Sequence, residues 1–406
     1  MTTHFELLTH NQKIYFIAEF FWNLGRTFPH AILTILLLNH SLTLIQIGIL
    51  QLVYMVTCIV FEFPSGVIAD LVSRKMLYSL SIILILIAYL LIFLNLNNFY
   101  ILIFSWSLYG FSLAIKSGTI ENDIVLEIRH DEQALTKFTK TESILFNISS
   151  IIGALLGSLV FHFFGKMLYI GACSLFGISF FISGYFKSFS QKVPEHTDET
   201  KVPNEIKPSK IMEHLISFFM HFKQRGILIC VVSYFVIALF SQPFYQYWQV
   251  FYKIKNIPIL LFGSVYTIFQ LANIAGAVLY EKIIKVKKLI FITLLLMIPL
   301  TVLTVMLNNE IVVFMLFPLI IIPFYLFNQF LSIYTRQITP KETISSFSSF
   351  LGVTVNVSSL LILGMILLML KVINILHIYV ICFTVFSLVA IILGVLMNKE
   401  LNKKKQ

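Results

Sequence analysis

The chain has 406 residues, of which 58% are hydrophobic and 12% are charged, and its mean hydropathy is +0.90. Soluble proteins carry about a quarter charged residues, so this composition excludes an ordinary soluble domain and indicates a surface that faces lipid. The net charge of +10 would suggest nucleic-acid binding in a soluble protein. In a membrane protein it reflects the excess of Lys and Arg in cytoplasmic loops, and we expect no nucleic-acid partner.

Polar clusters divide the sequence into twelve apolar segments, each long enough for a helix of roughly 20 residues to cross a bilayer. In chain order they lie near residues 14–38, 44–65, 76–96, 99–121, 141–165, 168–187, 226–250, 258–280, 288–307, 310–335, 344–369 and 373–397. The first segment is longer than a signal-peptide core and lacks a small-residue cleavage site, so we expect it to remain as a membrane helix. The sequence therefore predicts an all-α membrane protein with twelve transmembrane helices.

A long polar stretch separates the sixth segment from the seventh. It contains the run PEHTDETKVPNEIKPSK, which is too charged and too rich in proline to form a packed core. We predict an N-terminal six-helix bundle over residues 1–188, a cytoplasmic linker over 189–225 and a C-terminal six-helix bundle with a basic tail over 226–406. Residues 211–222 of the linker have the pattern of a helix that lies on the membrane surface; the alternative is a segment that only orients the seventh span.

Lys and Arg are distributed unevenly between the two sets of loops. With the N-terminus inside, 23 of the 29 basic residues fall on the cytoplasmic side, four fall outside, and Arg26 and Lys116 fall within spans. This asymmetry predicts a multi-pass protein of the cell (inner or plasma) membrane with both termini in the cytoplasm. The four cysteines lie in apolar segments without metal-ligand spacing, and we interpret them as structural.

A polar motif follows the second predicted span. Residues 66–75 read GVIADLVSRK, which resembles the signature of the major facilitator superfamily, roughly G-x-L-A-D-R-x-G-R-K, with departures at Leu71 and Ser73. Together with the twelve spans and the central linker, the resemblance covers the whole chain. It implies two pseudo-symmetric bundles that move a solute by alternating access.

The resemblance also implies a cytoplasmic gate. A carboxylate at Asp70 can accept hydrogen bonds from the free N–H groups at the start of a nearby helix, which in the family is the eleventh helix. Arg74 would pair with Asp70 and with an acid at the end of the fourth helix. The predicted gate residues are Gly66, Asp70, Arg74, Lys75, Glu121 and Asp123. The alternative is a turn whose charges only enforce topology.

Two further phrases resemble a group of bacterial efflux-type permeases within this superfamily. Residues 62–66 read EFPSG where that group has Glu-Pro-x-Gly, and residues 117–121 read SGTIE where it has Ser-Gly-x-x-Glu. Other marks of the family are altered: Trp106 stands where the fourth helix often has Arg, and Gly153 and Gly157 keep the glycine spacing of exporters without the proline. The two glycines equally fit close packing between helices.

The first predicted helix carries a set of polar residues on one face. Glu19, Asn23 and Arg26 recur at spacings of four and three residues, and an ionisable group inside the bilayer is costly unless it faces a cavity or a partner. Glu19 and Arg26 lie about 10 Å apart along the axis, too far for a direct salt bridge. We predict that Glu19 carries a coupling proton, with Glu62 as a second candidate, and that Arg26 binds an anionic part of the solute or biases Glu19. The alternative is a permanent structural network of Glu19, Asn23 and Arg26.

Amide and aromatic side chains in the later helices extend this polar face into one hydrogen-bonding wall. In the superfamily that the chain resembles, the first, fourth, seventh and tenth helices line the solute cavity. The predicted cavity residues are Asn23, Arg26, Trp106, Tyr109, Gln242, Gln246, Gln270, Asn273, Tyr325, Asn328 and Gln329. The alternative role of the amides is to pack helices against one another.

The sequence shows no phosphate-binding glycine loop, catalytic triad or metal-binding helix, so we predict neither an enzyme, nor a cofactor, nor a metal site. It predicts a secondary transporter, and it favours proton-coupled export of a small amphipathic compound by a monomer. The first alternative is an uptake permease for a small solute, by symport or facilitated diffusion. The second is a receptor or assembly protein that keeps the fold without transport.

Overall fold

The computed structural model describes residues 9–116, 119–128, 132–187, 225–283, 288–338 and 344–403, and all regular structure in these ranges is helical. The N-terminal half contains α2 (His10–Thr27), α3 (Leu33–Asn39), α4 (Leu44–Leu71), α5 (Arg74–Leu94), α6 (Phe99–Lys116), α7 (Ile120–Ile128), α8 (Glu132–Phe164), η1 (Gly165–Met167) and α9 (Leu168–Ser183). The C-terminal half contains α11 (Arg225–Ile254), η2 (Ile259–Leu261), α12 (Phe262–Ile283), α13 (Lys288–Met306), α14 (Glu310–Leu316), η4 (Phe317–Ile320), α15 (Ile321–Ile338), α16 (Ile344–Met369) and α17 (Ile375–Lys403).

Each of the twelve predicted segments is occupied by helix within the described ranges. Among the described residues, eight stretches are long and apolar enough, by length and composition, to cross a membrane. One of them, Ile144–Ser183, covers α8 from Ile144 onwards together with η1 and α9. The first predicted segment is divided into α2 and α3, and α2 ends at Thr27, two residues before Pro29. Proline lacks the N–H that would continue the helix. The predicted surface helix at 211–222 and the linker up to residue 224 lie outside the described residues.

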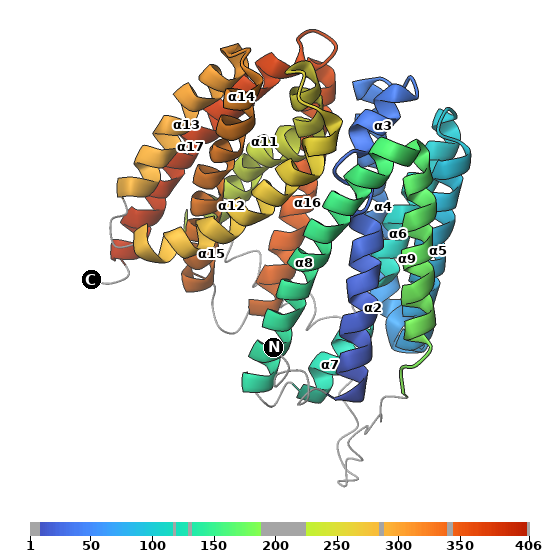
Figure 1. Ribbon diagram of the computed structural model, residues 1–406. Helices are drawn as coiled ribbons and strands as arrows, with labels where there is room; N and C mark the ends of the chain where they lie inside the picture. Colours follow the sequence, from blue (N-terminus) through green and yellow to red (C-terminus); the bar gives the residue numbers. More distant parts are fainter. Residues whose placement is uncertain are drawn as a thin grey trace.

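The two halves lie side by side, and Figure 1 shows the start of α2 and the end of α17 directed away from α3. We call the end of the molecule that contains α3 the α3 end, and the opposite end, where α7 lies, the α7 end. Between the halves, α8 packs on α12, α4 on α16 and α3 on α11. The sites described below therefore have walls from helices that are far apart in the sequence.

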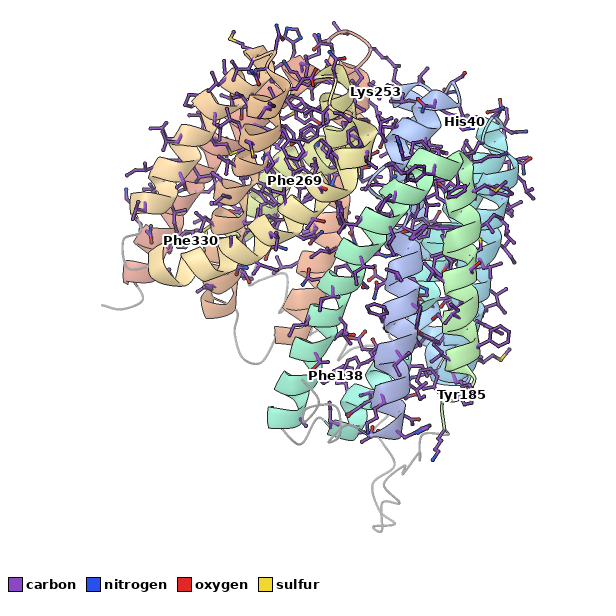
Figure 2. All side chains as sticks on the ribbon, in the orientation of Figure 1. His40, Phe138, Tyr185, Lys253, Phe269 and Phe330 are labelled. Carbon is purple, nitrogen blue, oxygen red and sulfur yellow. The ribbon has the colours of Figure 1, made fainter. Side chains whose placement is uncertain are left out.

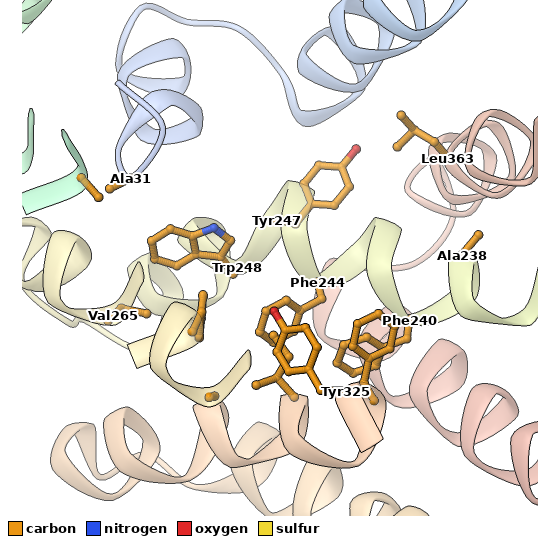
Figure 3. Close-up of a cluster of buried hydrophobic side chains, with 14 of the residues drawn as sticks. Ala31, Ala238, Phe240, Phe244, Tyr247, Trp248, Val265, Tyr325 and Leu363 are labelled. Carbon is orange, nitrogen blue, oxygen red and sulfur yellow. The ribbon is translucent and has the colours of Figure 1, made fainter. Parts of the chain in front are cut away.

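Aromatic rings fill the interior of the C-terminal half. Phe251 and Phe317 stack with their centroids 4.2 Å apart, and Phe244 also stacks with Phe317, at 5.2 Å. Phe240 extends the cluster to Phe324 at 4.5 Å, and Figure 3 shows Phe240 and Phe244 on α11 beside Tyr325. Each such pair contributes about 0.5–1.5 kcal/mol beyond its buried area, so this half has a continuous packed core.

Large apolar side chains also cover the outside of the molecule. Figure 2, which draws all side chains, shows mostly carbon on the outward-facing side chains. Phe104, Phe181, Leu296 and Ile392 are all exposed. A soluble monomer rarely presents apolar surface of this extent, whereas helices in a bilayer must turn such side chains to lipid. The outer surface is that of a membrane protein.

Two glycines on α8 bring that helix against the end of α2. A Cβ atom at Gly157 would collide with the backbone carbonyl of Phe28, and one at Gly153 would collide with the Thr27 hydroxyl. That hydroxyl donates to the carbonyl oxygen of Asn23 at 2.7 Å. The close-packing interpretation of the glycine pair therefore describes the observed contact, and it explains how α2 is held where its helix stops.

Candidate functional site

Two internal cavities meet at the side chain of Arg26, which lines both. The first lies towards the α3 end, has a volume of about 310 Å³ and is bounded by both halves, with α11 and α12 on one side and α2 to α6 and α9 on the other. The second lies towards the α7 end, has a volume of about 430 Å³ and is bounded by α2, α6, α7 and α8. We call them the upper cavity and the lower cavity.

Glu19 lies in the lower cavity and is held by three donors. Lys116 Nζ lies 2.9 Å from Oε2 of Glu19 in an ion pair, the Tyr78 hydroxyl donates to Oε1 at 2.9 Å, and Asn23 Nδ2 donates to Oε2 at 3.4 Å. Glu19 is 7% exposed. Lys116 Nζ also lies 4.1 Å from the centroid of the Trp22 ring, a favourable cation–π arrangement. These donors replace hydrogen bonds that the carboxylate would otherwise make with water.

Sequence reasoning did not find Lys116 as the partner of Glu19. The charge of Lys116 inside an apolar segment was the signal, but the position at the end of a helix also fits a side chain that reaches towards water. The structure places it against α2 because α6 ends beside the middle of the first helix, with Lys116 as its last residue. Because Glu19 and Arg26 are too far apart to pair with each other, Glu19 is available to Lys116.

Two more carboxylates line the lower cavity, Glu121 on α7 and Glu142 on α8. The Tyr15 hydroxyl donates to Oε1 of Glu142 at 2.6 Å. Glu142 precedes the apolar stretch that begins at Ile144. Burial raises the pKa of the Glu142 carboxyl, the bond from Tyr15 opposes this shift, and the nearby charge of Glu19 raises the pKa further. Glu142 is thus a group able to take up protons near Glu19.

Arg26 separates the two cavities without a carboxylate partner among the described residues. Its Nε atom is buried and has no hydrogen-bond partner in the described part of the chain. The guanidinium carbon lies 5.5 Å from the centroid of the Trp22 ring and 5.7 Å from that of Phe146. Aromatic faces stabilise the cation, and the guanidinium has a side-chain hydrogen bond with Tyr109. Nε stays without a partner among the described residues, so the guanidinium keeps a donor for an anion.

The predicted cavity residues are divided among three locations. Trp106, Tyr109, Gln246 and Gln270 line the upper cavity with Arg26, and Asn23 lines the lower one. The predicted residues that line neither cavity are Gln242, Asn273, Tyr325, Asn328 and Gln329.

Two of these outlying residues are buried behind the upper cavity. Tyr325 shares a hydrogen bond of 2.7 Å with Tyr245, whose ring lines that cavity. Gln242 is buried, and its Oε1 atom has no partner among the described residues. Helix spacing placed these side chains on the correct helices, but it could not show where along each helix the cavity ends.

The predicted gate residues lie at the α7 end, where α4 passes into α5. Arg74 forms an ion pair with Asp123 of α7, so the acid that meets Arg74 is Asp123, while Glu121 lines the lower cavity. Lys75 donates to the carbonyl oxygens at the end of α9, at 2.9 Å to Gly184 and 2.7 Å to Phe186.

The remaining gate and coupling candidates lie on α4. Gly66 and Asp70 belong to its last turns, and the Asp70 side chain and the start of α16 that it was expected to meet lie outside the described side chains. Glu62 is exposed and lines neither cavity. The structure thus gives Glu19, but not Glu62, a partner network inside a cavity.

The α3 end is closed by contacts between the halves, which sequence reasoning did not predict. Gln249 of α11 accepts from the Thr34 N–H at 2.8 Å and donates to the His30 carbonyl at 2.7 Å. Lys253 donates to Asn39 at 3.3 Å, and Figure 2 shows Lys253 at this end. A Cβ atom at Gly263 would lie 2.7 Å from the carbonyl oxygen of Ala154. Gln249 therefore serves as a bridge across the top of the upper cavity.

Comparison with known proteins gives one family and many similar structures. A profile of the Major Facilitator Superfamily matches residues 15–363. Similar solved structures include the nucleoside transporter NupG (TM-score 0.71, 12% identity, covering 96% of this chain and 99% of that chain). A bacterial homologue of the human lysosomal transporter Spinster, in an inward-facing unoccupied conformation, has a TM-score of 0.67 and 11% identity, with 96% of each chain covered.

A D-xylose-proton symporter is also similar, with a TM-score of 0.69 and 11% identity, covering 95% of this chain and 96% of that chain. No curated protein matches the sequence. At these identities the structural likenesses define the fold and leave the solute open.

Proposed function

Because the chain belongs to the major facilitator superfamily and is a secondary transporter rather than an enzyme, we propose that it works by alternating access, couples transport to protons through Glu19 and exports a small amphipathic compound. The predicted all-α superfamily fold is confirmed, and membership implies a small solute and a membrane location. The observation that carries the proposed coupling is the ion pair between the buried Glu19 and the partly buried Lys116. It lies in the lower cavity, which shares Arg26 with the cavity lined by both halves.

In this proposal the halves move as two bodies, residues 1–188 and 226–406, joined by the linker 189–225. The upper cavity has walls from both halves and is bridged at the α3 end by Gln249. Rocking of one half against the other would break these bridging contacts and form new ones between the halves at the α7 end. The Arg74–Asp123 pair at that end lies within the N-terminal half. We place the α7 end and both termini in the cytoplasm, on the strength of the basic loops there.

Protonation of Glu19 is the proposed coupling step. In its charged form Glu19 balances Lys116 inside the protein, and breaking a buried pair by removing one charge costs about 3–5 kcal/mol. Protonation therefore releases Lys116 and changes the energy of the α2–α6 contact. That change approaches the bias of about 5.5 kcal/mol that inverts a two-state equilibrium from 1:99 to 99:1, so it shifts the balance between two conformations by a smaller factor in the same direction.

Protons would reach Glu19 from the α7 end. The lower cavity brings Glu142 and Glu121 to the same space as Glu19. Burial raises the pKa of Glu142, which favours uptake of a proton at this carboxyl. A proton taken up by Glu142 would move to Glu19 through water in this cavity. The Arg26 side chain stands between this route and the upper cavity.

Export is the proposed direction because residues 62–66 and 117–121 resemble efflux-type permeases. Proton-coupled uptake is the second candidate, and the similarity to a D-xylose-proton symporter favours it. The two directions predict opposite movements of protons when the solute itself drives transport. Measuring the direction of proton movement therefore distinguishes export by antiport from uptake by symport.

The test uses purified protein in liposomes that contain a pH-sensitive dye and receive a panel of candidate solutes from outside. If the protein exchanges solute for protons, the solute should enter the liposomes and drive protons out, so that the lumen becomes more alkaline. An acidified lumen would instead establish symport. A solute that accumulates without any change of luminal pH would contradict proton coupling in either direction.

A further inference from the structure

We propose that the upper cavity binds planar aromatic carboxylates, with the carboxylate on Arg26 and the ring between the aromatic side chains of the two halves. The inference rests on the proposed function, since it names the solute class for the same cavity, but it concerns binding alone and can fail or succeed independently of proton coupling.

The charge of the cavity selects an anion. Among the residues that line the upper cavity, all of them described, Arg26 alone carries a fixed charge, and none is a carboxylate. The nearest candidate for a counter-ion on α2, Glu19, is already paired with Lys116. A charge in a membrane interior is costly unless a partner compensates it. An anionic solute in the upper cavity could therefore form an ion pair with Arg26, which no carboxylate of the cavity wall forms.

The donors of Arg26 favour a carboxylate among anions. Nε is buried without a hydrogen-bond partner in the described part of the chain, and a guanidinium presents its N–H groups in a planar fork that matches the two oxygens of a carboxylate. The rings of Trp22 and Phe146 lie against the guanidinium carbon at 5.5 and 5.7 Å. They limit the orientations of the fork, so that a bound carboxylate would be held in a defined plane.

The remaining wall is aromatic on both sides. Tyr54 and Tyr109 stack with centroids 5.1 Å apart and an interplanar angle of 25° in the N-terminal half. Trp248 and Phe269 meet edge to face at 5.3 Å in the C-terminal half, and all four line the cavity together with Trp106. Rings prefer stacked or edge-on neighbours, so this wall favours a flat ring over an aliphatic chain.

Size and polar groups narrow the class further. The volume of about 310 Å³ is at the lower end of the range for ligand pockets, which suits a solute of one or two fused rings. The amides of Gln246 and Gln270 line the same space and offer hydrogen bonds to substituents at the ring edge. A bulky multi-ring compound does not fit this conformation.

An aromatic wall could also hold a cation through the ring faces, so the charge of the ligand is the decisive variable. The experiment is isothermal titration calorimetry on the purified full-length protein with three probes of similar size. The probes are 2-naphthoate, the matched aromatic cation 2-naphthylmethylammonium and the non-aromatic anion cyclohexanecarboxylate. We expect 2-naphthoate to bind about tenfold or more tightly than either of the other two.

Variants assign the selectivity to residues. Arg26→Gln should weaken 2-naphthoate binding by about tenfold to a hundredfold, whereas Lys371→Gln, which removes the same charge from an exposed site, should leave it unchanged. Trp106→Leu should weaken 2-naphthoate more than cyclohexanecarboxylate. Arg26→Lys keeps the charge without the fork and should fall between wild type and Arg26→Gln, which provides a second measurement if Arg26→Gln does not fold.

The proposal is overturned if the ammonium probe binds as tightly as 2-naphthoate, if neither anion binds, or if the cyclohexane anion matches 2-naphthoate. It is also overturned if the folded Arg26→Gln or Arg26→Lys protein binds 2-naphthoate like wild type. Binding of 2-naphthoate without any luminal pH change in liposomes would leave this inference standing and contradict the proposed coupling. If other solutes drive proton movement but 2-naphthoate does not bind, the proposed coupling stands and this inference is contradicted.

Discussion

Glu19→Gln is expected to abolish solute accumulation driven by a pH gradient and to leave exchange of solute across the membrane intact. Glutamine keeps the shape of the side chain and one oxygen that can accept from Tyr78. Its amide nitrogen cannot accept from Asn23 or Lys116 as Oε2 does, and it cannot take up or release a proton. With one proton per solute, a gradient of one pH unit supports roughly a tenfold solute gradient, and the variant should support none. The measurement is solute uptake into proteoliposomes with an imposed pH gradient, beside counterflow of labelled solute without one.

The matched control for this prediction is Glu310→Gln, which removes a carboxylate from the exposed start of α14 at the α3 end. Its driven transport should equal that of wild type. If Glu19→Gln still accumulates solute, the coupling proton is carried elsewhere, and Glu62 becomes the next candidate. If Glu19→Gln loses exchange as well, Glu19 acts in the structural network with Asn23 and Lys116 rather than in coupling.

Gly157→Ala is expected to cause the largest loss of stability among alanine substitutions at the glycines whose surroundings the structure describes. The new Cβ would collide with the backbone carbonyl of Phe28, and a backbone atom cannot turn aside as a side chain can. Overpacking of this kind costs about 1–3 kcal/mol or more. The measurement is the temperature of thermal unfolding in detergent, with the yield of monodisperse protein as a second readout.

Gly177→Ala is the control, because a Cβ atom at Gly177 on α9 would meet nothing within 4 Å. Alanine is the better helix former by about 1 kcal/mol, so this variant should melt at or slightly above the wild-type temperature. Equal melting of Gly157→Ala and wild type would show that α8 does not approach the end of α2 as closely as described.

Hydropathy located the membrane helices because each crossing needs a long apolar run, and a sequence records such a run directly. Contacts between helices are a different matter, since the partner of a residue can lie anywhere along the chain. Glu19 was found from its charge on an apolar helix, but its partner Lys116 lies 97 positions later. The bridge from Gln249 to the Thr34 N–H spans 215 positions and uses a backbone group that carries no sequence signal.

The break between α2 and α3 shows the same limit on a local scale. Pro29 indicated a bend in the first helix, but the end of α2 at Thr27 also depends on Gly153 and Gly157 of α8, which admit the Phe28 carbonyl. In the gate, the sequence left Glu121 and Asp123 as equal partners for Arg74, since both lie at the end of the fourth span. The structure separates them, because successive side chains on α7 point in different directions and Asp123 meets Arg74.

The central claim is that the two halves alternate between closure at the α3 end and closure at the α7 end, under the control of Glu19. It is tested most directly by spin-label distance measurements on two cysteine pairs, with the native cysteines replaced. The pair Tyr100 and Val372 reports the distance between the halves at the α3 end, and the pair Met76 and Leu289 reports it at the α7 end. In each pair the first residue lies on the N-terminal half and the second on the C-terminal half, and all four side chains are exposed. We expect a change from alkaline to acidic buffer to move the two distances in opposite directions, and Glu19→Gln to remove this response. Two distances that stay fixed, or that increase or decrease together, would contradict the account.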